Sequence, residues 1–460
     1  MAAFRGAEMG DSQGGTRLER FSHLIAGLVP DAITASVVLT LSVTLVAFAL
    51  GNPVERMADA YYKGLWMLLP FTMQMTLIIV LSSALAATPF LRRAIGGLAR
   101  LPRSRNQVIV TAFLGAGTAS YLYWGLGYAL GPMIAIYCAA EAERRGIAID
   151  FPFLLGVTTA AQAVWQYGIS SSGPLLVASA GHFLQPVIGI VPLSATIWSP
   201  AALIHEAVYA GAAMIAACWL MPRNCRAISQ FPESLALTKA VQAPVPRSES
   251  AGSLSEGLER SSAVPAVLCS MFAVWLGYHF VVRRASLDIN SLNVTLLLLT
   301  FMLYRSVQRF ARGVQAGIGA SWAVIVLYHL YAGVAGMVQY TNVGEKATLA
   351  AASISGTSTF PFITALAGTV FACFIPSSGG QWTVQGFVTV KTAMAVGVSV
   401  PRGMLALGVG DHMGNFLTPF WYVVIAGIAR VDFRSFFGYG LVFSVIWFVV
   451  GVVVFTFAPC

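Results

Sequence analysis

Long uninterrupted runs of apolar residues dominate this chain. The clearest lie at residues 32–50, 64–87, 201–220, 263–282, 318–340 and 437–458. A run of about 18 or more apolar residues is long enough to cross the hydrocarbon core of a bilayer as an α-helix. Strands of a membrane β-barrel would instead alternate apolar and polar residues over about ten positions. The pattern therefore predicts an all-α polytopic membrane protein.

Other apolar stretches carry many Gly, Pro and Ser residues, so their limits are less distinct. At about 20 residues for each span plus short loops, we expect about ten to twelve membrane-embedded segments. The polar residues 1–20 lead directly into a full-length span, so we expect them to form a cytoplasmic tail and not a cleavable signal peptide.

The composition excludes several other classes of protein. Charged residues make up 10% of the chain and the mean hydropathy is +0.76, whereas an ordinary soluble domain carries about 25% charged residues. The six cysteines are scattered without a C-x-x-C pair, so they form neither a disulfide framework nor a metal pattern. The sequence contains no H-E-x-x-H motif, P-loop or convincing nucleophile–base pair. We therefore predict no enzymatic activity, no metal site and no cofactor.

The distribution of arginines predicts the orientation, because cytoplasmic loops are enriched in Lys and Arg. Residues 91–106 hold five arginines and no acidic residue, and residues 305–312 hold three more, whereas residues 181–200 carry no charged side chain. This places the N-terminus in the cytoplasm and the chain in a bacterial inner membrane, with Arg283 and Arg284 as exceptions on the outer side. The net charge of +9 then reflects loop bias, so we expect the lipid bilayer as a partner and no nucleic acid.

One long polar stretch, rich in Ser and Pro, divides the apolar material into two comparable parts. We expect residues 21–221 to form a first membrane half and residues 263–460 a second. Residues 222–262 between them carry five Lys and Arg residues, which predicts a cytoplasmic linker that is partly disordered.

Two short polar stretches interrupt the apolar runs, Ser-Ser-Ser-Gly-Pro at 170–174 and Pro-Ser-Ser-Gly-Gly-Gln-Trp at 376–382. Proline lacks an N–H and glycine is flexible, so we expect helix breaks at both. We expect two further breaks, at 121–127 in the first half and at 411–415 in the second. Each half then begins with a break, continues with a helix, a loop containing proline and a second helix, and ends with another break. The charge distribution gives the two series opposite orientations, which predicts two inverted-topology repeats.

The breaks are the best candidates for a binding site. Irregular backbone survives at membrane depth only where protein buries it or where it lines a wet cavity. Its N–H groups, the helix N-terminal dipoles and the Ser and Gln side chains suit an anion. The alternative is that small residues only let helices pack closely, but the density of polar groups at 376–382 favours a site. Four tryptophans flank the breaks and either shape a pocket or anchor the helices at the interface: Trp124, Trp165, Trp382 and Trp421.

Ionisable residues inside apolar stretches are the second set of candidates. Asp411 lies in Gly-Val-Gly-Asp-His-Met-Gly-Asn at 408–415, and an ionisable residue at membrane depth is a functional hypothesis by default. It would hold a coupling proton or contribute to a cation site; the alternative is a solvated turn near the membrane surface. His412 beside it would titrate near neutral pH. We expect His205 and Glu206 to form an interfacial pair.

Several motifs point to one family. They are Leu28-Val-Pro-Asp31, Phe71-Thr-Met-Gln-Met-Thr-Leu-Ile-Ile-Val80, Trp124-Gly-Leu-Gly127, Pro376-Ser-Ser-Gly-Gly-Gln-Trp-Thr-Val-Gln-Gly386, Gly410-Asp-His-Met-Gly-Asn415 and Pro419-Phe-Trp421. On these motifs the chain resembles the bacterial short-chain fatty acid transporters, the acetoacetate and butyrate carriers, over nearly its whole length. Ser378 stands where the family has a smaller residue and His412 where it has Gln, which leaves the substrate and the coupling ion open.

The resemblance implies a secondary active transporter of short-chain fatty acids, coupled to H⁺ or Na⁺. It also implies inverted repeats with re-entrant hairpins and interrupted helices, and a homodimer in which one domain moves against a scaffold. Carriers of dicarboxylates or of amino-acid-like anions, an anion channel and a membrane-embedded enzyme acting on lipid or acyl chains are the alternatives.

The expected site combines the breaks with the acidic motif. We expect the small carboxylate to be bound by backbone and side chains of Ser170, Ser171, Ser172, Gly173, Ser377, Ser378, Gly379, Gly380, Gln381 and Trp382. We expect Asp411 and Asn415 to provide ion coupling.

Overall fold

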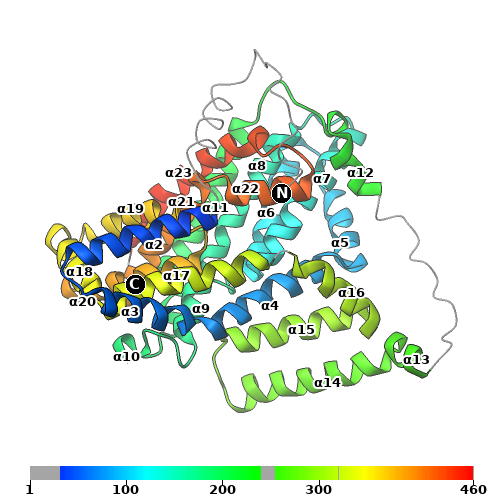
Figure 1. Ribbon diagram of the computed structural model, residues 1–460. Helices are drawn as coiled ribbons and strands as arrows, with labels where there is room; N and C mark the ends of the chain where they lie inside the picture. Colours follow the sequence, from blue (N-terminus) through cyan, green and yellow to red (C-terminus); the bar gives the residue numbers. More distant parts are fainter. Residues whose placement is uncertain (1–31, 240–253, 320, 459–460) are drawn as a thin grey trace.

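Every regular element in the described part of the chain is a helix, which confirms the all-α prediction (Figure 1). The computed structural model describes residues 32–239, 254–319 and 321–458, so the predicted tail 1–20 lies outside the described residues. The first half contains α2 (Ala32–Ala49), α3 (Val54–Met67), α4 (Leu69–Ala86), α5 (Pro89–Ala99), α6 (Arg105–Leu122), α7 (Trp124–Arg144), α8 (Phe151–Ala161), η2 (Gln162–Tyr167), α9 (Ser172–Ala178), α10 (Gln185–Ile188), η3 (Leu193–Ala195) and α11 (Pro200–Leu220).

The predicted linker 222–262 is described only in part, and its described portions are largely helical. It holds η4 (Ile228–Gln230), α12 (Pro232–Lys239) and α13 (Leu254–Arg260). The second half contains α14 (Ala263–Gly277), the π-helical η6 (Tyr278–Val282), α15 (Ile289–Tyr304), α16 (Val307–Ile318), α17 (Trp322–Tyr340), α18 (Val343–Ile354), α19 (Phe360–Ala372), α20 (Ser378–Ala395), α21 (Val400–Leu417), α22 (Phe420–Ala429) and α23 (Arg434–Phe457).

Several of these helices are long and apolar enough to cross a bilayer. Among the described residues four helical segments meet that test: Val54–Ala86, Pro200–Leu220, Ala263–Val282 and Arg434–Phe457. A fifth is formed when α17 and α18 are counted together as one span bent by 76°. Further apolar helices are shorter, such as Phe360–Ala372 and Phe420–Ala429. The estimate of about ten to twelve segments therefore stays a prediction.

Close helix contacts in the interior depend on glycine. α19 and α21 approach so closely that a Cβ on Gly410 would overlap the carbonyl of Ala365, and one on Gly414 would overlap the carbonyl of Thr369. α3 and α17 meet in the same way through Gly64 and Gly336. Small residues at crossing points are the usual means by which membrane helices pack without a hydrophobic driving force.

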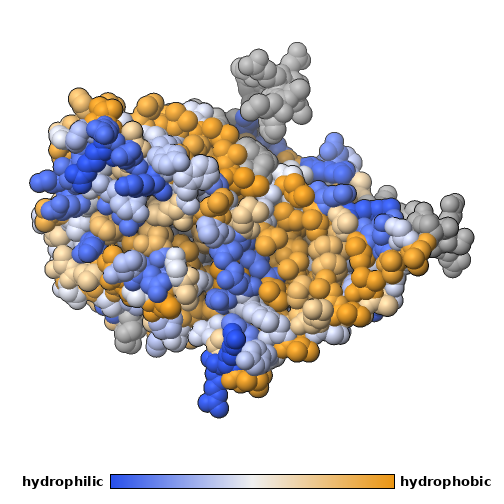
Figure 2. Space-filling view, turned by 60° about the horizontal axis from the view of Figure 1, so that its bottom comes forward, coloured by the Kyte–Doolittle hydropathy of each residue, from blue (hydrophilic) through white to orange (hydrophobic). Residues whose placement is uncertain are grey.

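An apolar layer lies at one edge of the molecule. α14 and α15 run side by side there, with α14 on the outside (Figure 1). Only 6% of the span formed by α14 and η6 is buried against other parts of the protein. The face that carries these helices is broadly apolar in the space-filling view (Figure 2), and its exposed side chains include Val267, Met271, Val274 and Val281. This surface fits contact with lipid chains, as expected for an integral membrane protein.

The two predicted series of elements recur in the structure, with one correction. In the first, α6 ends at Tyr123, α7 and α8 follow, and η2 leads to a break before α9. In the second, α19, α20, α21 and α22 follow in the same order. The break expected at 411–415 is wrong, since α21 continues to Leu417 and ends at Thr418. No proline lies between residues 402 and 418, and the glycines there provide close packing against α19 instead. The inverted relation of the two series remains a prediction.

Candidate functional site

The second break forms the start of a long helix. After α19 ends at Ala372, the chain turns through Pro376, and Ser377 becomes the N-cap of α20. The Ser377 hydroxyl accepts a hydrogen bond from the Gly380 N–H (3.4 Å) and donates one to the Tyr328 hydroxyl (2.9 Å). A serine N-cap satisfies one of the free N–H groups of the first turn. The sequence Pro-Ser-Ser thus fixes where α20 begins and holds it against α17.

The first break is held together by two of its serines. The Ser170 hydroxyl accepts a hydrogen bond from the N–H of Trp124, the first residue of α7 (2.8 Å). The Ser171 hydroxyl donates to the carbonyl of Gln166 (2.5 Å). The backbone N–H of Ile169 also donates to the carbonyl of Tyr121 (2.8 Å). These bonds tie the break before α9 to the break before α7, so both lie in one region.

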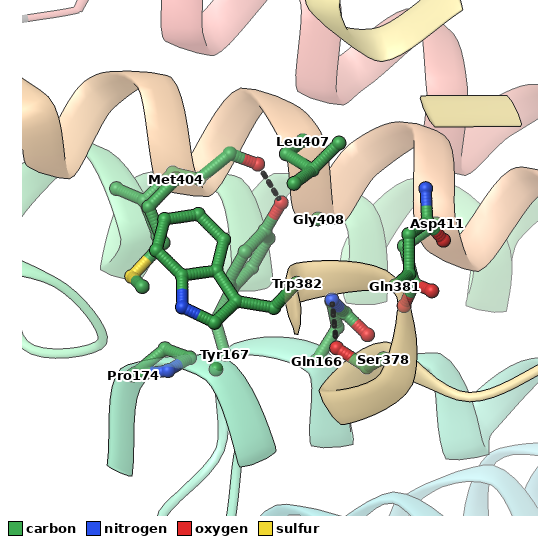
Figure 3. A pocket seen from close by; sticks show the side chains of 12 residues that line it. Gln166, Tyr167, Pro174, Ser378, Gln381, Trp382, Met404, Leu407, Gly408 and Asp411 are labelled. Atoms are coloured by element: carbon green, nitrogen blue, oxygen red, sulfur yellow. Dashed lines mark hydrogen bonds between the residues drawn. The ribbon is translucent and has the colours of Figure 1, made fainter. Parts of the chain in front are cut away.

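A small polar cavity lies between η2, α20 and α21 (Figure 3). We call it the polar cavity; its walls include Gln166, Tyr167, Ser378, Gln381 and Asp411. The Gln166 amide donates to the Ser378 hydroxyl (3.2 Å), as the dashed line in Figure 3 shows. The volume of the cavity is about 20 Å³, which holds one water molecule or a single ion but not an organic acid.

Asp411 is the only acidic side chain among the residues that line the polar cavity. It is 2% exposed, and its Oδ1 accepts a hydrogen bond from the Asn415 amide (3.1 Å) one helical turn later. Its Oδ2 has no donor within hydrogen-bond distance among the described residues. Ser378 and Gln166 are the polar side chains of the polar cavity that interact with this carboxyl group, so one oxygen of a buried carboxyl lacks a close donor.

Other oxygen atoms near Asp411 also lack donors. Within the described chain, the side-chain oxygens of Gln166, Gln381 and Asn415 make no hydrogen bond. The amide nitrogens of Gln381 and Asn415 donate to the carbonyls of Gly368 (2.7 Å) and Asp411 (2.9 Å), so the orientation of these two amides is fixed. Buried acceptors without donors are costly. Together with Asp411 they favour a proton or a cation at this place.

A larger cavity adjoins the polar cavity at Ser378, which lines both. We call it the aromatic cavity, because its walls include Trp124, Tyr128, Trp165, Tyr328, Tyr331, Phe420 and Trp421. Tyr128 and Trp421 stack with ring centroids 4.4 Å apart. Its polar groups include the side chains of Ser83, Ser172, Ser377, Ser378 and Asn415. The volume is about 370 Å³, within the range of small-molecule sites.

Three helices of ten or more residues begin at the aromatic cavity. They are α7 at Trp124, α20 at Ser378 and α22 at Phe420. Helix N-termini carry free N–H groups and the positive end of the helix dipole, so they attract anions. No Lys or Arg is among the described residues that line either cavity. Attraction for an anion would therefore come from backbone and hydroxyl groups.

The structure brings most of the predicted site residues to these two cavities. The aromatic cavity receives Ser172, Ser377 and Asn415, the polar cavity receives Gly173, Gln381, Trp382 and Asp411, and Ser378 lines both. Their roles remain predictions, because no bound molecule tests them.

Four predicted residues line neither cavity. Ser170 and Ser171 bond to backbone, as described above. Gly379 and Gly380 allow close packing, since a Cβ would lie 2.8 Å from Phe71 and 2.9 Å from Tyr331 respectively. These four residues support the site and do not line it.

Sequence reasoning missed several wall residues, among them Gln166, Tyr167 and Tyr328. Gln162 and Gln166 are polar residues four apart in an otherwise apolar run, a spacing that places them on one helix face. That pattern could have identified Gln166. Both members of the expected interfacial pair, His205 and Glu206, are buried within the protein, with 0% and 9% exposure, and their depth in the membrane stays a prediction.

The sequence is similar to a known protein family and to two known proteins. A family model described as short chain fatty acid transporter matches residues 16–458. Relatives from Escherichia coli (strain K12) and Haemophilus influenzae (strain ATCC 51907 / DSM 11121 / KW20 / Rd) are each 26% identical, over 446 and 450 residues. Each alignment covers 95% of this chain and 99% of the relative, and both relatives carry the provisional name short-chain fatty acid transporter.

A solved structure provides the fold comparison. The YdaH transporter of Alcanivorax borkumensis, described as having an unusual topology, aligns with a TM-score of 0.60 over 93% of this chain and 98% of its own. The identity is 14%, so this likeness concerns the fold alone. Since the family model matches nearly the whole sequence, the chain belongs to the short-chain fatty acid transporter family and is an integral membrane transporter.

Proposed function

We propose that this protein is a secondary active transporter of short-chain fatty acids, small monocarboxylates such as acetoacetate or butyrate, coupled to H⁺ or Na⁺. The observation that carries the proposal is Ser378, which lines both the aromatic cavity and the polar cavity that contains Asp411. A substrate carboxylate and a coupling ion would thus occupy adjoining spaces.

The substrate would bind in the aromatic cavity. Its carboxylate would accept a hydrogen bond at the start of α20, from the hydroxyl of Ser378, with the N-termini of α7 and α22 contributing favourable dipoles. Its acyl chain would contact aromatic walls such as Tyr128 and Trp421. Burial of each methylene group contributes about 0.8 kcal/mol, which favours an acid with a short apolar chain over a dicarboxylate.

Asp411 gives a physical reason for ion coupling. A substrate carboxylate at Ser378 would lie close to a second carboxyl group, and two like charges in a buried site repel each other strongly. A proton on Asp411, or a Na⁺ ion held by its unpaired oxygen and the neighbouring amide oxygens, removes this repulsion. Substrate and ion would then bind together or not at all, which is the basis of symport.

The proposal also includes the membrane location, the orientation and the assembly of the protein. We infer that the protein lies in a bacterial inner membrane with its N-terminus in the cytoplasm, from the arginine-rich loops described above. We further propose two inverted repeats and a homodimer, in line with the family resemblance.

Uptake of labelled butyrate into proteoliposomes tests this function. A proton gradient and a sodium gradient are imposed in separate experiments, and we expect one of them to drive butyrate inside the liposomes above its external concentration. We expect this accumulation to be lost when an ionophore collapses the gradient that drives it. Acetoacetate should compete and a dicarboxylate should not. Downhill flux that no ion gradient changes would indicate a channel, and absence of competition by any short monocarboxylate would overturn the substrate assignment.

A further inference from the structure

A second buried carboxyl group lies outside the two cavities. Glu206 is the seventh residue of α11, one of the helices long enough to span the membrane. Its side chain is 9% exposed, and neither carboxyl oxygen has a hydrogen-bond partner among the described residues. Burying an ionised carboxylate without a partner is very costly. In this conformation the group is therefore expected to hold a proton.

A histidine beside it is equally isolated from hydrogen bonds. His205 is fully buried, and neither ring nitrogen is bonded within the described chain. Its ring contacts Trp447 at 4.3 Å and Tyr167 at 5.1 Å between centroids. His412 contacts the same Trp447 at 4.6 Å, and its nitrogens are also unbonded there. Two imidazoles thus pack against one tryptophan, one of them next to Asp411 in the sequence.

Tyr167 connects this cluster with the proposed coupling site. Its ring contacts His205, while the same residue lines the polar cavity with Asp411. Its hydroxyl donates to the carbonyl of Leu405 on α21 (2.6 Å).

The arrangement is poorly explained as structural packing alone. Each buried polar group without a partner costs about 1–3 kcal/mol, and an apolar side chain would fill the same space without that cost. Ionisable residues retained inside membrane helices usually serve ion or proton movement. No Lys or Arg among the described residues pairs with Glu206, so a fixed ion pair does not account for it.

We propose that Glu206 is a second proton-binding carboxyl of the transporter, beside the buried cluster of His205, His412 and Tyr167. When the group releases its proton, the Glu206 O–H bond breaks and the proton passes to water in a conformation that opens the site, leaving a carboxylate. The reverse step restores the neutral carboxyl. This proposal concerns a group separate from Asp411, and Tyr167, which contacts His205 and lines the polar cavity, connects the two regions. This inference builds on the proposed coupling role of Asp411.

Infrared difference spectroscopy of the purified full chain in liposomes tests proton binding without any substrate. Between about pH 6 and pH 10, exposed carboxylates stay ionised, so changes in the C=O stretch of protonated carboxyls report buried groups. We expect one component to disappear in Glu206→Gln and to remain in the control Glu345→Gln, an exposed position on α18. A Glu206→Gln spectrum identical to that of the wild type would overturn the inference, whatever the protein transports.

Transport assays add a readout that separates proton binding from packing. We expect Glu206→Gln to lower proton-driven accumulation about tenfold while substrate exchange persists, and Glu206→Asp, which keeps the carboxyl, to retain more accumulation. If Glu206 only fills space, the ranking reverses, because Gln is closer in size to Glu. Where Glu206→Gln does not fold, Glu206→Asp replaces it in the infrared measurement: a shifted C=O component supports the inference, and a spectrum identical to that of the wild type contradicts it.

Discussion

At the scale of single residues, Ser378 and Asp411 decide what the site can do. Ser378 is the residue that the two cavities share, and Asp411 is buried behind it with an unpaired oxygen. A hydrogen bond from a hydroxyl group to a carboxylate is charge-assisted, and it is stronger than a hydrogen bond between two neutral groups. In the proposed mechanism the substrate and the ion would meet between these two side chains, which come from α20 and α21.

Replacing Asp411 with Asn removes the charge while keeping the shape. We expect accumulation of butyrate against a gradient to fall to simple equilibration, because Asn needs no ion before a carboxylate can enter. Exchange of internal for external butyrate should remain within about threefold of the wild type, since Asn imitates the neutralised acid. Accumulation and exchange are measured in the same proteoliposomes; unchanged coupled accumulation would falsify the role of Asp411.

Replacing Ser378 with Ala removes a donor from the proposed carboxylate site. A hydrogen bond to a charged group contributes about 1.5–3 kcal/mol, so we expect the Kd for butyrate to rise by about tenfold or more. Ser353→Ala on α18, where the hydroxyl is exposed and bonds only to the Ala350 carbonyl, should leave binding unchanged. Equal affinities for Ser378→Ala and the wild type would place the carboxylate elsewhere.

At the scale of helices, close packing of α19 on α21 positions Asp411. Gly410 immediately precedes it and leaves no room for a Cβ against the Ala365 carbonyl. α21 thus combines a packing face of small residues with a polar face directed at the cavity. A shift of α19 away from α21 would alter the position of the carboxyl group itself.

The change Gly410→Ala tests this packing. We expect it to destabilise the protein by about 1–3 kcal/mol, the usual cost of overpacking. The matched control is Gly427→Ala on α22, where nothing lies within 4 Å of the added Cβ; there Ala should be neutral or stabilising by up to about 1 kcal/mol. Thermal unfolding in detergent measures both, and equal effects would show that the close contact is unimportant.

The sequence predicted helices and breaks where local chemistry decides them. Pro376 and the Ser-Ser-Ser-Gly-Pro stretch at 170–174 carry proline and N-cap residues, and the structure has breaks at both. The polar stretch at 411–415 contains no proline, and its glycines serve packing against α19, which pattern alone could not distinguish from a break. Gln166 was missed although Gln162 and Gln166 lie four residues apart in an apolar run, because its partner Ser378 is known only after α20 is in place.

At the scale of the whole molecule, residues from the breaks of both halves line the aromatic cavity, while α14 lies at the outer edge of the molecule (Figure 1). Family membership makes the protein a transporter, and the proposed repeats would let one half move relative to the other. If the substrate binds in the aromatic cavity as proposed, the size of that cavity would limit which acids are carried.

The affinity of the protein for a fatty acid should rise with the length of the acyl chain until the aromatic cavity is filled. Each added methylene contributes about 0.8 kcal/mol, or about fourfold in Kd, so we expect acetate to bind more weakly than propionate and propionate more weakly than butyrate. Competition with labelled butyrate measures the series. A flat series would indicate that the acyl chain does not contact the aromatic walls.

The most direct test of the account is the linkage between ion and substrate binding. Trp124, Trp165 and Trp421 line the aromatic cavity, so tryptophan fluorescence can follow butyrate binding to the purified protein at varied pH and Na⁺ concentration. Binding linkage is reciprocal; the account predicts that butyrate affinity rises with the concentration of one of the two ions in the wild type. In Asp411→Asn the affinity should be independent of both. Wild-type affinity that neither H⁺ nor Na⁺ changes would contradict ion-coupled carboxylate transport at this site.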